Sequence, residues 1–211
     1  MMADLQLSEV NQLQTVEYWD GRYKKDETEI TFDWFKSFHD LEPFFRKYMD
    51  WNPAKKILML GCGNSTLSKD LYDSGLRRIV NVDFSPTCIQ RMKETYPEPE
   101  MTWQVMDVRD MSMLDDSSFD YAIDKGTLDA LLSYTGSVWT IPDDVKANTD
   151  RYMSEICRVL KPGGSLLYVS YRQPHFAKPV LQRSDWNVEV DVLADQAGGF
   201  EYFGYNVRKN H

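Results

Sequence analysis

The sequence predicts an α/β fold with a doubly wound, seven-stranded sheet that carries an antiparallel C-terminal hairpin strand. Strand-like and helix-like segments alternate after residue 55, a pattern typical of a parallel sheet with helices on both faces. The apolar run 57–60 leads directly into a turn that contains Gly61 and Gly63, which indicates a buried parallel strand. Two extended runs near the end of the chain surround a glycine pair, which predicts the hairpin.

Five short apolar runs bounded by turn residues predict the other strands. They span 56–61, 78–83, 101–106, 118–123 and 164–170. Helices are expected at 65–74, 85–96 and about 143–160. The last helix should end at Lys161-Pro162-Gly163-Gly164, because proline and glycine stop a helix and turn the chain. The hairpin strands are expected at 186–193 and 200–207, on either side of Ala197-Gly198-Gly199.

The length of 211 residues and the hydrophobic content of 42% suit one domain with a sizeable core. We expect a single domain over 1–211, in which 1–51 form an N-terminal aromatic helical cap and 52–211 form the core with the sheet. Trp19 and Tyr23 lie four positions apart in the aromatic segment, so they would share one helix face. That face covers either the core or the mouth of a ligand site.

Composition limits the partners that the chain can have. A formal net charge of −9 would repel a phosphate backbone, so nucleic acid is not expected, whereas a basic protein partner would be attracted. No segment approaches the ~20 apolar residues of a membrane span, and the N-terminus has no basic apolar leader. Cys62, Cys88 and Cys157 form no Cys-x-x-Cys pair, so we expect no metal and a reducing, cytoplasmic location. A monomer is favoured.

The glycine turn has the features of a nucleotide-binding site. Gly61 and Gly63 allow the backbone to turn tightly and to approach a ligand closely. Asp83 ends the next apolar run, where a carboxylate would meet the hydroxyls of a ribose, so the ligand should contain adenosine. A dinucleotide site would have a third glycine where this chain has Thr66. The looser turn favours S-adenosylmethionine, which has no phosphate to place on the helix N-terminus.

Asp107 and Val108 close the third strand at the same edge of the sheet as Asp83. The carboxylate of Asp107 can accept a proton from the adenine amino group, and the Val108 amide can donate to a ring nitrogen. Alternatively, Asp107 caps the turn 108–110. Because two carboxylates stand at successive strand ends, we favour the ligand role.

Tyr121-x-x-x-Lys125 has the spacing of the catalytic pair of short-chain dehydrogenases. On a helix these two side chains would meet, but 119–123 alternates as a strand, in which four positions span about 13 Å. An oxidoreductase is therefore disfavoured. Asp124 and Lys125 are expected instead in the loop between cofactor and acceptor, as positioning residues, or else as solvated charges. No catalytic residue is assigned.

Three further features have two interpretations each. Asp129 is either an acceptor-side carboxylate or, by default, a residue on a helix surface. His175 follows the fifth strand, where an acceptor could enter, yet it equally suits a structural loop. The segment 133–150, which contains Trp139, is long enough to be a lid or docking loop that selects the acceptor, or else is a solvated connection.

Five motifs can now be taken together. They are Leu60-Gly61-Cys62-Gly63-Asn64-Ser65, Asp83-Phe84-Ser85, Met106-Asp107-Val108, the Asp-Lys-Gly-Thr-Leu-Asp-Ala of 124–130 and the Val-Leu-Lys-Pro-Gly-Gly of 159–164. They resemble the motifs of class I methyltransferases, which have a Rossmann-like seven-stranded sheet. Two N-terminal motifs are Glu17-Tyr18-Trp19-Asp20-x-Arg22-Tyr23 and Phe32-Asp33-Trp34-Phe35. They narrow the resemblance, over about 15–208, to the group with the lysine methyltransferases of translation elongation factor 1-alpha, including the one encoded beside endothelin-converting enzyme 2.

The resemblance implies S-adenosylmethionine as cofactor and gives individual residues a role toward it. Trp19, Tyr23 and Trp34 would close over the cofactor, and Gly61 would meet its methionine end. The remaining implied roles are ribose binding by Asp83, stacking near adenine by Phe84, reading of the adenine edge by Asp107 and Val108, and a place beside the cofactor for Lys125. A relative in the group has glutamate at the position of Asp124, which leaves the role of Asp124 open.

The resemblance also implies a protein lysine as acceptor, in a substrate of the elongation factor 1-alpha type. The chain lacks the Asn/Asp-Pro-Pro-Tyr type motif of enzymes that methylate amides or exocyclic amines, which weakens glutamine and nucleobase acceptors. A small-molecule methyltransferase and a non-catalytic, cofactor-binding scaffold are the alternatives. An NAD(P)-dependent oxidoreductase has the least support.

Overall fold

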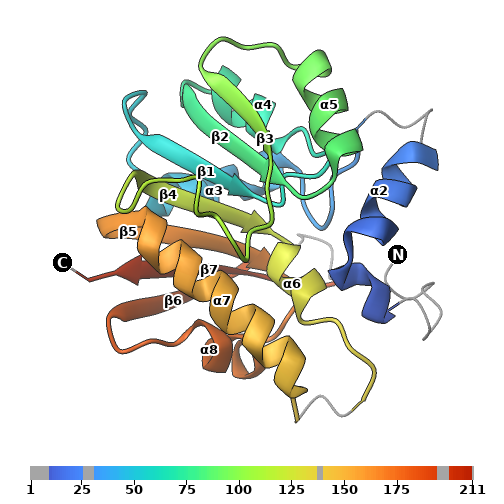
Figure 1. Cartoon of the computed structure of the whole chain (residues 1–211). Coiled ribbons are helices and arrows are strands. Elements are labelled where there is room, and N and C mark those ends of the chain that lie inside the picture. The colour runs from blue at the N-terminus through green and yellow to red at the C-terminus, as the bar shows by residue number, and fades with distance from the viewer. Residues whose placement is uncertain (1–9, 26–30, 137–139, 194–199, 211) are drawn as a thin grey trace.

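The computed structural model describes residues 10–25, 31–136, 140–193 and 200–210. Its centre is a seven-stranded sheet with the strand order β3-β2-β1-β4-β5-β7-β6 (Figure 1). The strands are β1 (Lys56–Leu60), β2 (Arg78–Asp83), β3 (Met101–Val105), β4 (Phe119–Lys125), β5 (Leu160–Ser170), β6 (Trp186–Leu193) and β7 (Tyr202–Lys209). Strands β1 to β5 pair in parallel, and β7 runs antiparallel between β5 and β6. The predicted doubly wound sheet with an antiparallel C-terminal strand is confirmed, while the predicted hairpin turn at 197–199 lies outside the described residues.

Helices cover both faces of the sheet (Figure 1). One face packs against α3 (Phe38–Tyr48), α4 (Leu67–Asp73) and α5 (Pro86–Thr95). The other packs against α6 (Thr127–Leu131), α7 (Asp143–Val159) and α8 (Pro174–Leu181). The short helix η2 (Asn11–Gln14) and the helix α2 (Val16–Lys25) lie beside α6 and α5. The three predicted helices thus form close to their expected bounds.

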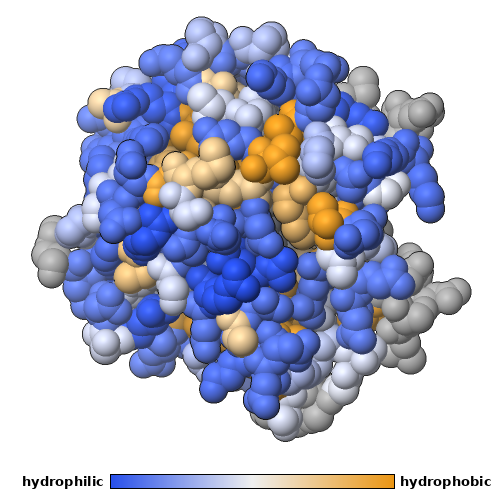
Figure 2. Space-filling view, in the orientation of Figure 1, coloured by the Kyte–Doolittle hydropathy of each residue, from blue (hydrophilic) through white to orange (hydrophobic). Residues whose placement is uncertain are grey.

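The core has one apolar cluster on each face of the sheet. Leu58 and Leu60 of β1 belong to the cluster beneath α6, α7 and α8, whereas Ile57 and Met59 belong to the cluster beneath α3, α4 and α5. Side chains along a strand point to alternate faces, so a strand covered on both faces is apolar throughout. On the face seen in Figure 2, hydrophilic residues cover most of the surface, and apolar residues form a smaller band. In the part of the chain that the structure describes, no helix is both long and apolar enough to cross a membrane.

The Lys-Pro-Gly-Gly segment 161–164 differs from its prediction. Sequence reasoning placed it before a strand at 164–170, but β5 already begins at Leu160, directly after α7. The pairing of β4 with β5 changes register at this point, and Gly163 has a positive φ of 75°. The segment is therefore a bulge within the strand, where glycine allows the conformation, rather than a turn that precedes it.

Candidate active site

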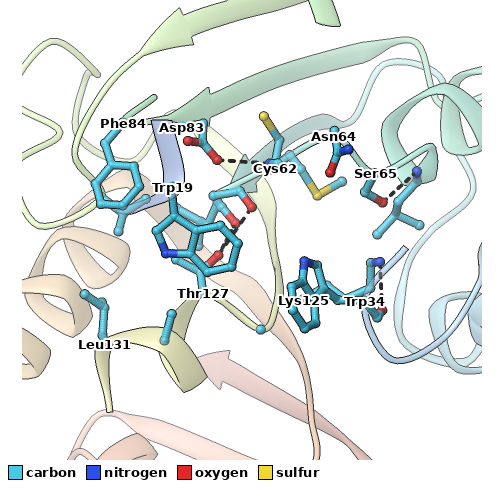
Figure 3. Close-up of a pocket in the computed structure, with 18 of the residues that line it drawn as sticks. Trp19, Trp34, Cys62, Asn64, Ser65, Asp83, Phe84, Lys125, Thr127 and Leu131 are labelled. Carbon is cyan, nitrogen blue, oxygen red and sulfur yellow. Dashed lines mark hydrogen bonds between the residues drawn. The ribbon is translucent and has the colours of Figure 1, made fainter. Parts of the chain in front are cut away.

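A cavity opens at the carboxyl ends of β1, β2, β3 and β4, and residues of η2 and α2 contribute to its wall. Asp83 and Phe84 lie on one side of it, and Lys125 and Trp34 lie on the other (Figure 3). All the predicted cofactor-binding residues line this cavity: Trp19, Tyr23, Trp34, Gly61, Gly63, Asp83, Phe84, Asp107, Val108 and Lys125. The structure brings them together from α2, the ends of four strands and the segment before α3, while the role of each toward a cofactor stays a prediction.

The turn after β1 is shaped by close contacts that leave no room for side chains. Gly61 has a φ of 56°, and a Cβ atom there would lie 2.1 Å from the Oγ1 atom of Thr127. Gly63 has a φ of 52°, and its Cβ would lie 3.0 Å from the hydroxyl of Tyr23. Thr127 is held in place because its hydroxyl donates to the Leu60 carbonyl at 2.9 Å. Glycine is required at both positions, and the exposed backbone of the turn faces the cavity.

Asp83 is a buried carboxylate of the cavity wall, with 4% of its surface exposed. Its Oδ2 atom accepts a hydrogen bond from the Gly63 amide at 3.0 Å, and its Oδ1 atom accepts one from the Ser85 amide at 2.9 Å. Burial raises the pKa of Asp83 to about 6, against the opposing effect of these two amides. The carboxylate thus fixes the turn after β1 to the start of α5, and a ligand hydroxyl would add donors that favour its charged form.

Asp107 and Val108 line the cavity beside Phe84, as the ligand hypothesis requires. The alternative role of Asp107 is also present: its Oδ1 atom accepts from the Arg109 amide at 2.8 Å, so it caps the turn. The Arg109 guanidinium donates to both carboxylate oxygens, with the closest contact 2.7 Å long. Arg109 itself lines the cavity and was not predicted. A ligand at Asp107 would therefore meet an ion pair rather than a lone carboxylate.

Aromatic rings form the outer wall of the cavity. The Trp19 ring lies 5.9 Å from Trp34 and 6.1 Å from Tyr23, and the guanidinium carbon of Arg22 lies 4.9 Å from the Trp34 ring. Helix α2 is attached to α5 through Asp20, whose carboxylate accepts from the Ser85 hydroxyl and the Thr87 amide. The shared face of Trp19 and Tyr23 serves both predicted purposes, because Tyr23 is buried in the core and both rings line the cavity.

Lys125 connects the end of β4 to the segment before α3. Its ammonium donates to the Asp33 carboxylate at 2.8 Å and to the Trp34 carbonyl at 3.0 Å, and only 5% of its side chain is exposed. Burial lowers the pKa of Lys125, and the nearby Asp33 carboxylate opposes that effect. Asp33 also accepts from the hydroxyls of Ser65 and Thr66. Lys125 and Asp33 thus hold the wall segment 31–37 against the glycine turn.

A family model described as a methyltransferase domain matches residues 58–168. The chain belongs to the methyltransferase family. Mouse EEF1A lysine methyltransferase 4 is 33% identical to it over 201 residues, which cover 94% of this chain and 76% of that protein. Human eEF1A lysine and N-terminal methyltransferase is 36% identical over 186 residues, which cover 86% of this chain but 25% of that protein. The crystal structure of a SAM-dependent methyltransferase from Methanosarcina mazei has the same fold, with a TM-score of 0.61 at 18% identity over 80% of this chain and 97% of that chain.

The cofactor of the methyltransferase is S-adenosylmethionine, and the residues present fit that molecule. The cavity offers an apolar and aromatic wall, a buried carboxylate at Asp83 and an exposed backbone at Gly61 and Gly63. These match an adenine ring, a ribose and a methionine end in turn. The dehydrogenase pair is not assembled, since the Tyr121 hydroxyl accepts from the Asp50 amide and Lys125 pairs with Asp33.

Asp124 is not a solvated loop charge, its alternative interpretation, and Asp129 does not lie on a helix surface, its default prediction. Both are fully buried, and neither lines the cavity. Asp124 accepts from the Tyr152 hydroxyl at 2.5 Å and from two amides at the start of α6, so it fixes the helix that contains Thr127. Asp129 accepts from the hydroxyls of Tyr168 and Ser170. Asp124 therefore touches the site only through α6, and its positioning role remains a prediction.

The other open features are placed as follows. His175 is exposed at the second position of α8. Residues 143–150 of the expected lid segment belong to α7, and Trp139 lies outside the described residues. Sequence reasoning missed Leu13, Phe35, Arg109 and Thr127 as cavity residues. The sequence does contain a signal for Phe35, because it belongs to the motif 32–35, although only Trp34 of that motif is predicted to bind the cofactor.

Replacing Lys125 with methionine is expected to lower the free energy of unfolding by about 1–3 kcal/mol. Methionine keeps the apolar contacts but removes the donor to Asp33 and to the Trp34 carbonyl. Denaturant unfolding measures the change. Lys47→Met is the matched control, because Lys47 pairs with Asp191 at 2.7 Å but is 54% exposed, and solvent screens such surface pairs so that they contribute little to stability. Equal losses in the two variants would contradict a structural role for Lys125.

Stability of the cofactor-free methyltransferase is expected to fall as the pH rises from about 4 to 7. Burial raises the pKa of Asp83 to about 6, of Asp124 to about 7 and of Asp129 to about 6. In the unfolded chain an aspartate has a pKa of about 3.9, so between about pH 4 and 7 the folded state binds more protons. The free energy of unfolding then decreases with pH across that window. Denaturant titrations at several pH values measure it, and Asp124→Asn should flatten the slope; a slope that rises with pH would contradict these pKa shifts.

Proposed function

We propose that the methyltransferase transfers a methyl group from S-adenosylmethionine to a lysine of a protein of the elongation factor 1-alpha type. The observation that carries the proposal is the 33% identity, over 94% of this chain, with a mouse protein named as a lysine methyltransferase of EEF1A. The formal charge of −9 supports it, since an acidic surface attracts a basic protein partner. We further propose that the protein acts in the cytoplasm as a monomer, without nucleic acid.

The proposed roles follow from the position of each residue in the cavity. Asp83 would bind the ribose, and Phe84 would stack near the adenine. Asp107 and Val108 would read the adenine edge, with Arg109 holding the carboxylate of Asp107 in place. Gly61 and Gly63 would present backbone to the methionine end, and Trp19, Tyr23 and Trp34 would cover it. Lys125 would secure the covering segment beside the cofactor.

The cofactor supplies an electrophilic methyl group on a sulfonium sulfur. The protein has to align an amine with that methyl group and exclude water from it. Its aromatic wall is suited to exclusion, and the hydrogen bonds of Asp83 and Lys125 keep the wall and the glycine turn in fixed positions. No covalent enzyme intermediate is required.

The rate of methyl transfer is expected to rise with pH between about 6 and 9. A lysine has a pKa of about 10.4 in water and attacks only after it has lost its proton, so the reactive fraction grows with pH. Single-turnover rates with the protein acceptor measure the chemical step. A flat profile would argue against a lysine acceptor or against loss of the proton before attack.

The direct test incubates the protein and tritiated S-adenosylmethionine with a cognate cell lysate and locates the label by mass spectrometry. Label on a lysine of elongation factor 1-alpha is the expected result. Label confined to the small-molecule fraction would make the protein a small-molecule methyltransferase. Tight cofactor binding without any labelled product would make it a scaffold, and binding of NADH in place of S-adenosylmethionine would make it an oxidoreductase.

A further inference from the structure

Three aromatic rings continue the cavity wall beyond Lys125. The Phe35 ring centroid lies 5.9 Å from that of Tyr171 and 5.4 Å from that of Tyr202. Phe35 lines the cavity, Tyr171 directly follows β5, and Tyr202 is the first residue of β7. All three side chains are partly exposed. We call Phe35, Tyr171 and Tyr202 the ring wall.

The backbone at Phe35 is strained. Its φ is 66°, which a bulky residue rarely adopts, and the Lys36 amide donates to the Trp34 carbonyl at 2.9 Å across it. A three-residue turn with positive φ is a rare and strained conformation. Such strain persists only where the surroundings hold it, and it gathers at functional sites.

The surroundings that hold Phe35 belong to the active site. The Trp34 carbonyl that closes the turn also accepts from the Lys125 ammonium, and Asp33 pairs with the same ammonium. On the other side, a Cβ atom at Gly126 would lie 3.1 Å from the Phe35 ring, so the ring rests directly on the loop after β4. Four neighbouring residues thus fix one phenyl ring at the edge of the cavity.

The order of the strands shows on which side of the cofactor the ring wall lies. The residues proposed to bind adenine and ribose lie at the ends of β2 and β3, and the glycine turn lies at the end of β1. The ends of β4 and β5 and the start of the antiparallel β7 follow next in the sheet, on the side away from the adenine. A nucleophile has to approach the methyl group from a side that the cofactor does not fill, and the ring wall borders that side.

Lys36 shows which chemical group can bind to the ring wall. The Lys36 ammonium lies 5.5 Å from the centroid of the Tyr202 ring, within the range of a cation–π contact. Tyrosine and phenylalanine faces attract ammonium groups and pack along alkyl chains. The acceptor proposed above presents both an alkyl chain and an ammonium.

We propose that the ring wall receives the side chain of the acceptor lysine and guides its nitrogen from solvent to the end of the cavity near Gly126. This inference rests on the proposed function, because it takes the acceptor to be an alkylammonium. Phe35 borders the cofactor cavity, and the acceptor ammonium would displace the Lys36 ammonium from the Tyr202 ring. The three rings determine acceptor affinity and do not bind adenosine.

The first measurement compares KM for elongation factor 1-alpha, kcat and the Kd of the cofactor among variants. Tyr202→Leu removes the aromatic face at similar size and should raise KM about threefold to tenfold while leaving the Kd of the cofactor unchanged. Tyr202→Phe keeps the face and should stay within about twofold of the parent. Phe35→Gly removes a ring without straining the turn, since glycine accepts a positive φ, and should also raise KM. Tyr72→Leu is the control, because Tyr72 contacts the Arg77 guanidinium at 4.5 Å in the same way but belongs to α4 and not to the ring wall.

The second measurement does not depend on the protein acceptor. N-acetyl-lysine methylamide is titrated into the protein loaded with S-adenosylhomocysteine, and ring resonances are followed by NMR. The norleucine counterpart, which lacks the ammonium, is the control probe. Shifts of Tyr171 and Tyr202 with the lysine probe alone, reduced in Tyr202→Leu, are expected.

The two measurements separate the inference from the proposed function. A protein that leaves elongation factor 1-alpha unmethylated yet shows ammonium-dependent shifts at the rings would refute the named substrate and support the ring wall. The ring wall is supported if KM or the probe response depends on the Tyr202 ring. It is overturned if neither does.

Discussion

Gly61→Ala is expected to weaken cofactor binding by at least about 100-fold, or about 2.7 kcal/mol. The new methyl group would lie 2.1 Å from the Thr127 hydroxyl, at a φ of 56°. The strand end and α6 would have to move apart, because the Thr127 hydroxyl is hydrogen-bonded to Leu60. Such a movement displaces the backbone that faces the methionine end of the cofactor. Calorimetric titration with S-adenosylmethionine measures the loss.

Two controls separate the steric conflict from backbone strain. Gly75 has a φ of 111° with nothing within 4 Å of its Cβ position, so Gly75→Ala introduces strain alone and should leave cofactor affinity unchanged. Adding Thr127→Ala to Gly61→Ala removes the closest clashing atoms and should restore part of the affinity. Full affinity in Gly61→Ala alone would show that the turn does not border the cofactor.

Asp83→Ala is expected to reduce cofactor affinity by about 1.5–3 kcal/mol, or about 10-fold to 150-fold. The change removes the proposed ribose contact and leaves the Gly63 and Ser85 amides without their acceptor. Thermal stability should fall as well, because unsatisfied buried donors are costly. Asp73→Ala is the matched control, since the Asp73 side chain is 58% exposed and pairs with Lys69 on the surface. Unchanged affinity in Asp83→Ala would refute the ribose assignment.

Features that depend on local pattern were predictable from the sequence. Asp83 follows an apolar run that can only be a buried strand, so its place at the carboxyl edge of the sheet could be inferred without a structure. The prediction that Tyr121 and Lys125 do not form a dehydrogenase-type catalytic pair was likewise correct, because both residues lie in strand β4. Alternation of apolar residues and the carboxyl-edge rule were sufficient for these conclusions.

Features that depend on distant partners were not predictable. Asp129 lies in a five-residue helix and is hydrogen-bonded to Tyr168 and Ser170 of β5, some 40 positions away. Nothing in the sequence near Asp129 therefore indicates that it is buried. The start of β5 was missed because proline and glycine usually end an element, whereas here they form a bulge against β4. The backbone conformation of Phe35 was not predictable either, because a positive φ is contrary to the preference of phenylalanine.

Strand β7 is the last strand in the chain, yet it lies between β5 and β6. Tyr205 and Val207 in it are fully buried. Among the described strands β6 pairs with β7 alone, so until β7 inserts, β6 has no partner and β5 is unpaired on that side. During that interval both flanking strands offer unpaired edges that other chains can join. A folding intermediate that has formed the rest of the sheet but has not yet inserted β7 is therefore the species that a chaperone would have to protect.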